Sequence, residues 1–244
     1  MTATLTTRAM TTRTMTISAI HAAYRSGELT PQQLLTECLA HAKADTHLAW
    51  ISVLSDAQLA AYLKGLEGHS PDDMPLFGIP FAVKDNIDVA GLTTTAACPA
   101  FAYQPTQDAT VVARLKAAGA IVLGKTNLDQ FATGLVGTRS PYGAVANTFD
   151  SAYISGGSSS GSASVVARGL VPFALGTDTA GSGRVPAGFN NLVGWKPTRG
   201  AFSTTGVLPA CRSLDCVSIF ALTVVDAQLL AAQMSAFDAT DIYS

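Results

Sequence analysis

The chain has 244 residues, of which 48% are apolar and only 13% are charged. This composition excludes an intrinsically disordered chain and predicts a globular protein with a large core. A net charge of −2 indicates no basic surface for nucleic acid, and the longest uncharged stretches, such as residues 151–167, are too rich in Gly and Ser to span a membrane.

The first two helices are marked by their ends. Residues 1–15 contain many threonines, two arginines and no acid, and they predict a disordered tail without a secretory signal. From Thr16 apolar residues recur at helical spacing as far as Gly27, which favours the end of a helix. Thr30 and Gln33 then form the capping pattern that predicts the start of a second helix.

After these helices the pattern of apolar residues changes. Short apolar runs at residues 77–83, 120–123 and 171–175 predict buried strands, and they alternate with helical patterns such as residues 109–118. This alternation predicts an α/β fold in which helices cover a mixed, mostly parallel central sheet. Because no repeat or linker interrupts it, residues 16–244 are interpreted as one domain.

The cysteines indicate neither a disulfide framework nor a metal site. They show no C-x-x-C pair and no zinc-like spacing with histidine. Four cysteines in a chain of this size are ordinary for the reducing cytoplasm, where we expect this protein. All four are expected to be buried as small apolar groups, namely Cys38, Cys98, Cys211 and Cys216.

Residues 119–126 match the phosphate-loop pattern G-x-x-x-x-G-K-T. The chemistry of that motif needs a loop between the two glycines, whose N–H groups surround a phosphate. Here the intervening residues are themselves a strand-like apolar run. The segment is therefore interpreted as the end of a helix followed by a strand, without nucleotide binding.

Residues 157–161 match the nucleophile-elbow pattern G-x-S-x-G of serine hydrolases. That motif requires a strand directly before it and a histidine base later in the chain. Every histidine of this chain lies earlier, at His21, His41, His47 and His69. A serine–histidine–acid hydrolase is therefore excluded.

Three polar segments interrupt the apolar pattern. Lys84 ends the apolar run at residues 78–83, which places it at the end of a buried strand. A Gly/Ser stretch at residues 155–163 leads into an apolar helical pattern, and the Gly-rich segment 176–186 follows a predicted strand. A flexible linker is not expected between strand and helix patterns within one domain, so these segments are candidates for a functional site.

The three segments together favour acyl transfer. A serine hydroxyl is a weak nucleophile that needs a base, and without a usable histidine a neutral lysine can take that role. Burial disfavours the charged form of a lysine, so the pKa of Lys84 is expected to fall. Backbone N–H groups of a Gly-rich turn can also converge on a developing oxyanion.

The sequence resembles the amidase signature family over almost the whole chain, from Thr16 to Asp238. The blocks that carry the resemblance are residues 78–86, 124–129, 156–163 and 176–186. The resemblance implies a catalytic triad of Ser182 as nucleophile, Ser158 as a bridging serine after a cis peptide bond, and Lys84 as base. It also implies an oxyanion hole made by the backbone N–H groups of Thr179, Ala180, Gly181 and Ser182.

Within the family, the likeness is strongest to the branch that hydrolyses allophanate. Ala180 stands where the general pattern has a glycine, and residues 127–134 and 189–200 also resemble that branch. The likeness implies that ammonia is released and N-carboxycarbamate remains, in the breakdown of urea or cyanuric acid. It implies a small-molecule amide substrate, no metal or organic cofactor, no nucleic-acid or membrane partner, and a homodimer.

Three alternatives stay open. A general amidase and an amidotransferase component that passes ammonia to a partner share the family fold, while an inactive fragment would keep only the fold. Domains of this family are longer than the present chain. We therefore expect residues 16–244 to be the N-terminal portion of such a domain, with an incomplete fold and with the substrate-binding residues not identified.

Overall fold

A computed structural model describes residues 15–244. The tail that the sequence predicts at residues 1–15 thus lies outside the described residues except for Met15, which is buried in the core and is not part of a free tail. None of the helices in the described part of the chain is both long and apolar enough to cross a membrane.

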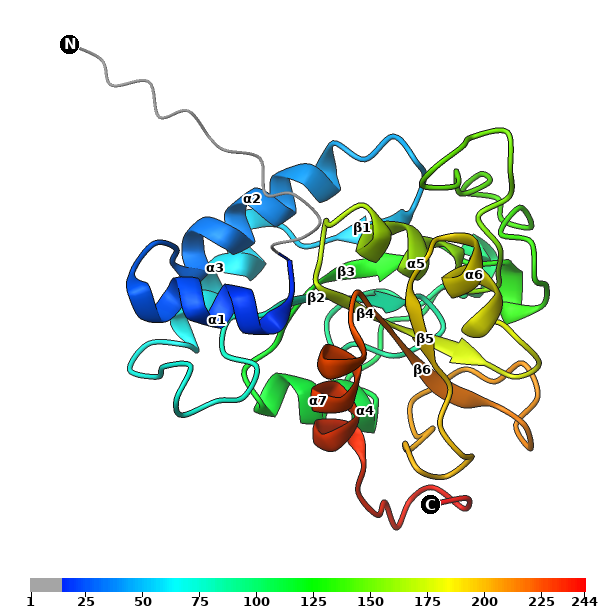
Figure 1. Ribbon diagram of the computed structural model, residues 1–244. Coiled ribbons are helices and arrows are strands. Elements are labelled where there is room, and N and C mark those ends of the chain that lie inside the picture. The colour runs from blue at the N-terminus through cyan, green and yellow to red at the C-terminus, as the bar shows by residue number, and fades with distance from the viewer. Residues whose placement is uncertain (1–14) are drawn as a thin grey trace.

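The centre of the described structure is a six-stranded sheet with the order β1-β3-β2-β4-β6-β5 (Figure 1). Strands β2, β3 and β4 are parallel, β1 and β6 run antiparallel to this central group, and β5 again runs in its direction. The predicted mixed, mostly parallel sheet is confirmed. The strands are β1 Trp50–Val53, β2 Pro80–Lys84, β3 Ile121–Thr126, β4 Phe173–Asp178, β5 Val193–Trp195 and β6 Cys216–Ala221.

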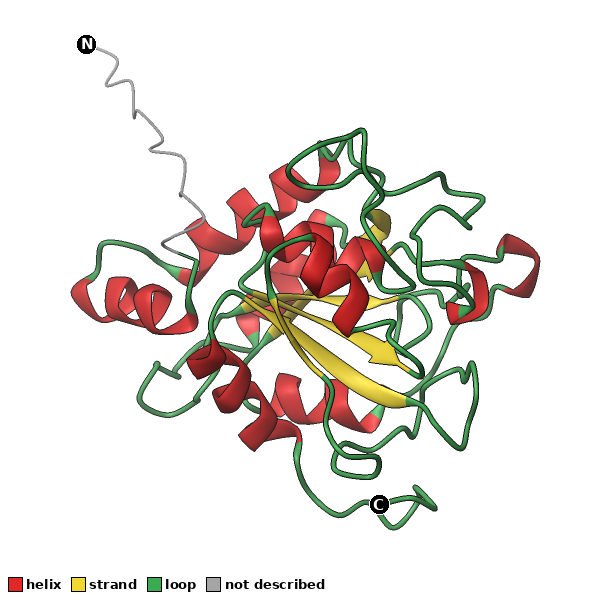
Figure 2. Ribbon diagram, turned by 45° about the vertical axis from the view of Figure 1, so that its right-hand side comes forward, coloured by secondary structure: helices red, strands yellow, loops and turns green. Residues whose placement is uncertain are grey.

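Helices cover both faces of this sheet (Figure 2). Helix α5 packs on one face, where it contacts the central strands, while α7 packs on the other face beside α4. Strands β2, β3, β4 and β6 are consequently buried along their whole length, which is why they consist of nearly continuous apolar runs. The helices are α1 Ile17–Ser26, α2 Pro31–Lys43, α3 Asp56–Lys64, α4 Thr110–Ala117, α5 Ser160–Ala167, α6 Arg184–Phe189 and α7 Val224–Met234.

The predicted end of α1 and the predicted start of α2 are confirmed, and the structure adds a cap at the start of α1. Thr16 caps α1 through its hydroxyl, and α1 ends at Gly27, whose φ of 74° is left-handed and suits glycine. The side chain of Thr30 accepts the N–H of Gln33, whose own side chain accepts the N–H of Thr30. This reciprocal pair starts α2, as predicted.

The phosphate-loop pattern at residues 119–126 is a helix end and a strand. Gly119 follows α4 with a φ of 99°, and β3 runs directly through Gly124 and Lys125. A side chain at Gly124 would collide with the Ser52 carbonyl of the neighbouring strand, so this glycine serves strand packing. The interpretation against nucleotide binding is consistent with this geometry.

The prediction that all four cysteines are buried is wrong for two of them. Cys38 and Cys216 are buried, but Cys98 is half-buried and Cys211 is exposed. Cys98 and Cys211 lie in connecting segments outside the helices and strands, and such segments run over the surface of a protein. In residues 15–244, no group of three His, Cys, Asp or Glu side chains is arranged to hold a metal ion.

Candidate active site

Lys84 lies at the centre of the candidate site. It is the last residue of β2 and is fully buried, as the sequence predicts. Its Nζ donates hydrogen bonds to Ser158 Oγ at 2.7 Å and to Thr177 Oγ1 at 2.8 Å. Because β2 and β4 are parallel neighbours, Lys84 and Thr177 reach the same edge of the sheet.

The electrostatic surroundings of Lys84 favour a neutral amine. Burial lowers the pKa of Lys84 from 10.5 to about 7, against the opposing influence of Asp129, Asp215 and Asp178, whose charges raise it. Within the described residues, no carboxylate forms an ion pair with Lys84. Its two partners are hydroxyl groups, which can accept from an ammonium and donate to an amine.

Ser158 is held at the start of a buried helix. The peptide bond between Gly157 and Ser158 is cis, and α5 begins two residues later at Ser160. Every residue of α5 is buried. A side chain at Gly161 would collide with the Ala49 carbonyl, so the small residues of this stretch permit close packing. The Gly/Ser stretch is therefore part of the site and not a linker.

Ser182 lies in the loop between β4 and α6 and is 4% exposed. Its carbonyl accepts a hydrogen bond from the backbone N–H of Ser159 at 3.3 Å, which ties it to the segment that carries Ser158. Its hydroxyl donates to the carbonyl of Gly134 at 3.5 Å. In the described part of the chain the hydrogen bonds thus join Lys84 to Ser158, while the Ser182 hydroxyl turns toward Gly134.

The loop around Ser182 is organised by Asp178, the last residue of β4. Its buried carboxylate accepts the backbone N–H groups of Gly181 at 2.8 Å and of Gly183 and Arg184 at 3.1 Å. The N–H of Gly181, one of the four predicted oxyanion-hole donors, is therefore occupied by Asp178. Among the described residues, those of Thr179, Ala180 and Ser182 have no acceptor.

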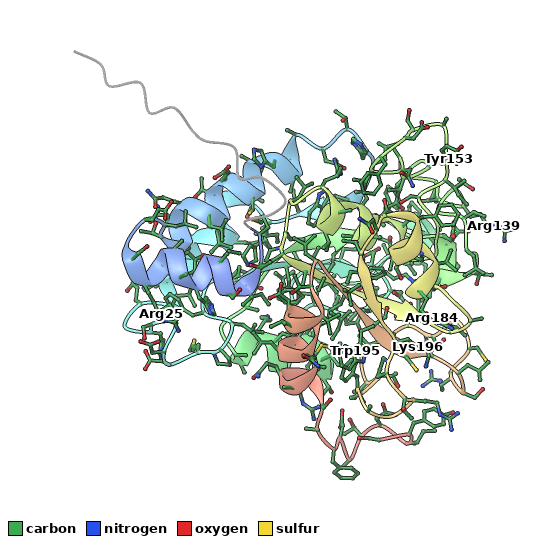
Figure 3. The ribbon with its side chains drawn as sticks, in the orientation of Figure 1. Arg25, Arg139, Tyr153, Arg184, Trp195 and Lys196 are labelled. Carbon is green, nitrogen blue, oxygen red and sulfur yellow. The ribbon has the colours of Figure 1, made fainter. Side chains whose placement is uncertain are left out.

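Arg184 lies at the start of α6 (Figure 3), and its side chain completes the contacts of Asp178. Its guanidinium donates to both carboxylate oxygens, at 2.9 and 3.0 Å, and its side chain is 55% exposed. Burial by itself would raise the pKa of Asp178, but the hydrogen bonds from Arg184 and the backbone outweigh burial and lower that pKa. Asp178 is thus a stable anion beneath the loop that carries Ser182.

Three residues of this site have no role in the sequence interpretation. Thr177 and Asp178 lie within the Gly-rich block 176–186, and Asp129 ends the block 124–129. A polar residue at the end of a buried strand is the signal that identified Lys84, and it also applies to Thr177 and Asp178. No comparable signal marks Asp129, which follows β3 in a loop.

The fold and the site together define a class of protein. The family model described as Amidase matches residues 33–244, and the chain belongs to that family. The resemblance to the amidase signature family is thereby confirmed.

Particular relatives are more similar than the family as a whole. The urea amidolyase of Saccharomyces cerevisiae is 65% identical over 74% of this chain and 10% of its own length. A glutamyl-tRNA(Gln) amidotransferase component of Streptococcus pneumoniae is 42% identical over 95% of this chain and 48% of its own length. A solved structure of Kluyveromyces lactis allophanate hydrolase has a TM-score of 0.87 and 53% identity, covering 94% of this chain and 38% of that one. The chain therefore spans less than half the length of each of these relatives.

Proposed function

We propose that this chain carries the nucleophile of an amide hydrolase that acts on allophanate. The observation that carries the proposal is the buried Lys84, whose low pKa and hydroxyl partners suit a neutral base in contact with Ser158. A neutral lysine can accept a proton from a serine and so replace the missing histidine. The similarity to urea amidolyase and allophanate hydrolase supports the choice of substrate.

In the proposed reaction, Ser182 Oγ attacks the terminal amide carbon of allophanate. Its proton passes to Ser158, and the proton of Ser158 passes to Lys84, which requires the Ser182 hydroxyl to turn from Gly134 toward Ser158. The N–H groups of Thr179, Ala180 and Ser182 stabilise the negative charge on the carbonyl oxygen. Ammonia leaves with a proton returned along the same path, and water then releases N-carboxycarbamate from Ser182. No metal or organic cofactor takes part.

A second candidate function is supported by the amidotransferase relative. That protein is similar over 95% of this chain, so the same triad would release ammonia from an amide for transfer by a partner. Glutamine hydrolysis would indicate this function, whereas hydrolysis of simple aliphatic amides would indicate a general amidase.

The test compares ammonia release from allophanate, biuret, glutamine and aliphatic amides, both by this chain and by a longer version of it. Ser182→Ala is expected to abolish turnover without loss of the folded state. The matched control is Ser160→Ala, because the buried Ser160 hydroxyl has no hydrogen-bond partner in residues 15–244. A serine-directed fluorophosphonate should label Ser182, and labelling of Ser159 in its place would contradict the assignment.

A further inference from the structure

Asp129 is a fully buried carboxylate outside the proposed triad. Its Oδ2 accepts the backbone N–H groups of Val136 at 3.1 Å and Gly137 at 3.0 Å, and its Oδ1 accepts that of Arg139 at 2.9 Å. No cationic side chain of the described residues pairs with it. Its charge is therefore stabilised by the N–H groups of one loop, residues 134–139.

This loop and Asp129 also reach both serines of the site. The backbone N–H of Asp129 donates to the carbonyl of Ser158 at 3.1 Å, while Gly134 at the start of the loop places its carbonyl 3.5 Å from Ser182 Oγ. Asp129 thus contacts Ser158 through its backbone. Its side chain binds the loop 134–139, and Gly134 of that loop contacts Ser182.

The carboxylate is packed between two glycines. A Cβ on Gly134 would lie 2.8 Å from Asp129 Oδ2, and a Cβ on Gly157 would collide with the same oxygen. Gly134 also has a φ of 152°, a backbone conformation that favours glycine. No side chain larger than that of Asp fits this space without moving the loop or the segment that carries Ser158.

We propose that Asp129 is a positioning residue whose buried carboxylate fixes the loop 134–139, and that this loop keeps Ser182 beside Ser158, so that the Ser182 hydroxyl can turn from Gly134 to Ser158 for attack. The inference rests on the proposed function, in which Ser182 is the nucleophile. Displacement of a reacting group by about 1 Å can lower a rate about 10²-fold, so a loop that holds the nucleophile has a large effect on catalysis.

The charge of Asp129 gives this role a second signature. Asp129 has the largest effect among the three carboxylates that raise the pKa of Lys84; the others are Asp215 and Asp178. Two other charged groups are neutralised by their own partners: Arg184 is paired with Asp178, and Lys125 of β3 is paired with Asp85, which directly follows Lys84. Loss of the Asp129 charge should therefore lower the pKa of Lys84 further.

The principal test is Asp129→Asn in this chain and in a longer version of it. Asn keeps the shape but places an NH₂ group against backbone donors, so Ser182 should lose its fixed position. We expect kcat for allophanate and the rate of fluorophosphonate labelling at Ser182 to fall about 10²-fold, with KM nearly unchanged. The acid limb of the pH–rate profile should move to lower pH, which a merely structural role would not produce.

Two further variants distinguish the effect of the Asp129 charge from the effect of its packing. They also test the proposal if Asp129→Asn does not fold. Asp129→Glu keeps the charge but not the fit, so labelling should slow while the acid limb stays in place. Gly134→Ala disturbs the same contact from the loop and leaves the buried carboxylate intact, and it should also slow labelling. The matched control is Asp226→Asn, a buried carboxylate in α7 that accepts the N–H of Ile17 at 3.2 Å; it should change neither labelling nor the pH profile.

The outcomes distinguish this inference from the proposed function. If Ser182 of the wild-type protein is labelled but allophanate is not hydrolysed, the substrate assignment fails, and the labelling rates still test the role of Asp129. Labelling within about twofold of wild type in both Asp129→Asn and Gly134→Ala, with no shift of the acid limb, would overturn the positioning role. Absence of labelling in the wild-type protein would overturn the nucleophile assignment and the positioning role together.

Discussion

Two buried lysines on adjacent strands show how differently one sheet can use the same side chain. Lys84 on β2 and Lys125 on β3 are both fully buried. Lys84 contacts hydroxyl groups, whereas Lys125 Nζ lies 2.9 Å from Asp85 Oδ1 and donates to Thr94 Oγ1 at 3.0 Å. Burial lowers the pKa of both, but at Lys125 the directly paired carboxylate opposes it. Burial therefore acts on both lysines, and they differ in their direct partners, which are hydroxyl groups at Lys84 and a carboxylate at Lys125.

We expect the greatest loss of activity when Lys84, the lysine with hydroxyl partners, is replaced. Lys84→Ala should lower kcat/KM for allophanate by about 10²–10⁴-fold, because Ser158 and Ser182 lose their base. Lys84→Arg should be nearly as damaging, since a guanidinium does not lose its proton in the working range. Steady-state ammonia release measures both variants, and a near-normal rate in either one removes Lys84 from the mechanism.

Replacement of Lys125, the lysine paired with Asp85, should lower the free energy of unfolding. Lys125→Met leaves Asp85 charged and buried without its cation, which should lower the free energy of unfolding by about 3–5 kcal/mol. Lys84→Met should cost about 1–2 kcal/mol, because only hydroxyl partners are left behind. Urea denaturation measures both, and the double variant Lys125→Met with Asp85→Asn should recover part of the loss. Equal costs for the two lysines would contradict the comparison.

The pH dependence sharpens the comparison for Lys84. Its pKa of about 7 in the folded protein is below its ordinary value of 10.5, so between these values the unfolded chain binds more protons. The free energy of unfolding of the wild type should therefore rise with pH across this window relative to Lys84→Met. Activity should rise with pH through about 7, where the base becomes neutral. A flat stability difference measured from pH 7 to pH 10 would show that Lys84 stays charged.

The smallest expected effect concerns the ion pair of Asp178 with Arg184. The Arg184 side chain is 55% exposed, so solvent screens the pair, and Arg184→Gln should cost about 1 kcal/mol or less. Asp178→Asn should lower the rate of ammonia release more than Arg184→Gln does, because three backbone N–H groups of the loop that carries Ser182 lose a charged acceptor. Ammonia release and thermal unfolding measure both variants. A greater loss in Arg184→Gln than in Asp178→Asn would contradict this prediction.

Features that depend on nearby residues could be predicted from the sequence. The capping pair at the start of α2 acts over three residues, the end of α1 is marked by Gly27, and the apolar runs of β2, β3 and β4 are long enough to indicate burial. The short edge strands β1 and β5 are half-buried, and neither has a run that identifies it. Lys84 could be selected because a charge at the end of an apolar run is a local signal.

The contacts between groups at the site depend on how distant segments pack together. Lys84 reaches Ser158 across 74 residues of sequence and Thr177 across 93, and both contacts depend on the order of strands in the sheet. The different partners of the two buried lysines also depend on the tertiary structure. Strand pairing and loop placement bring Asp85 into contact with Lys125 and hydroxyl groups into contact with Lys84. A pKa depends on burial and on charges from distant segments, and neither is encoded in the residues beside the lysine.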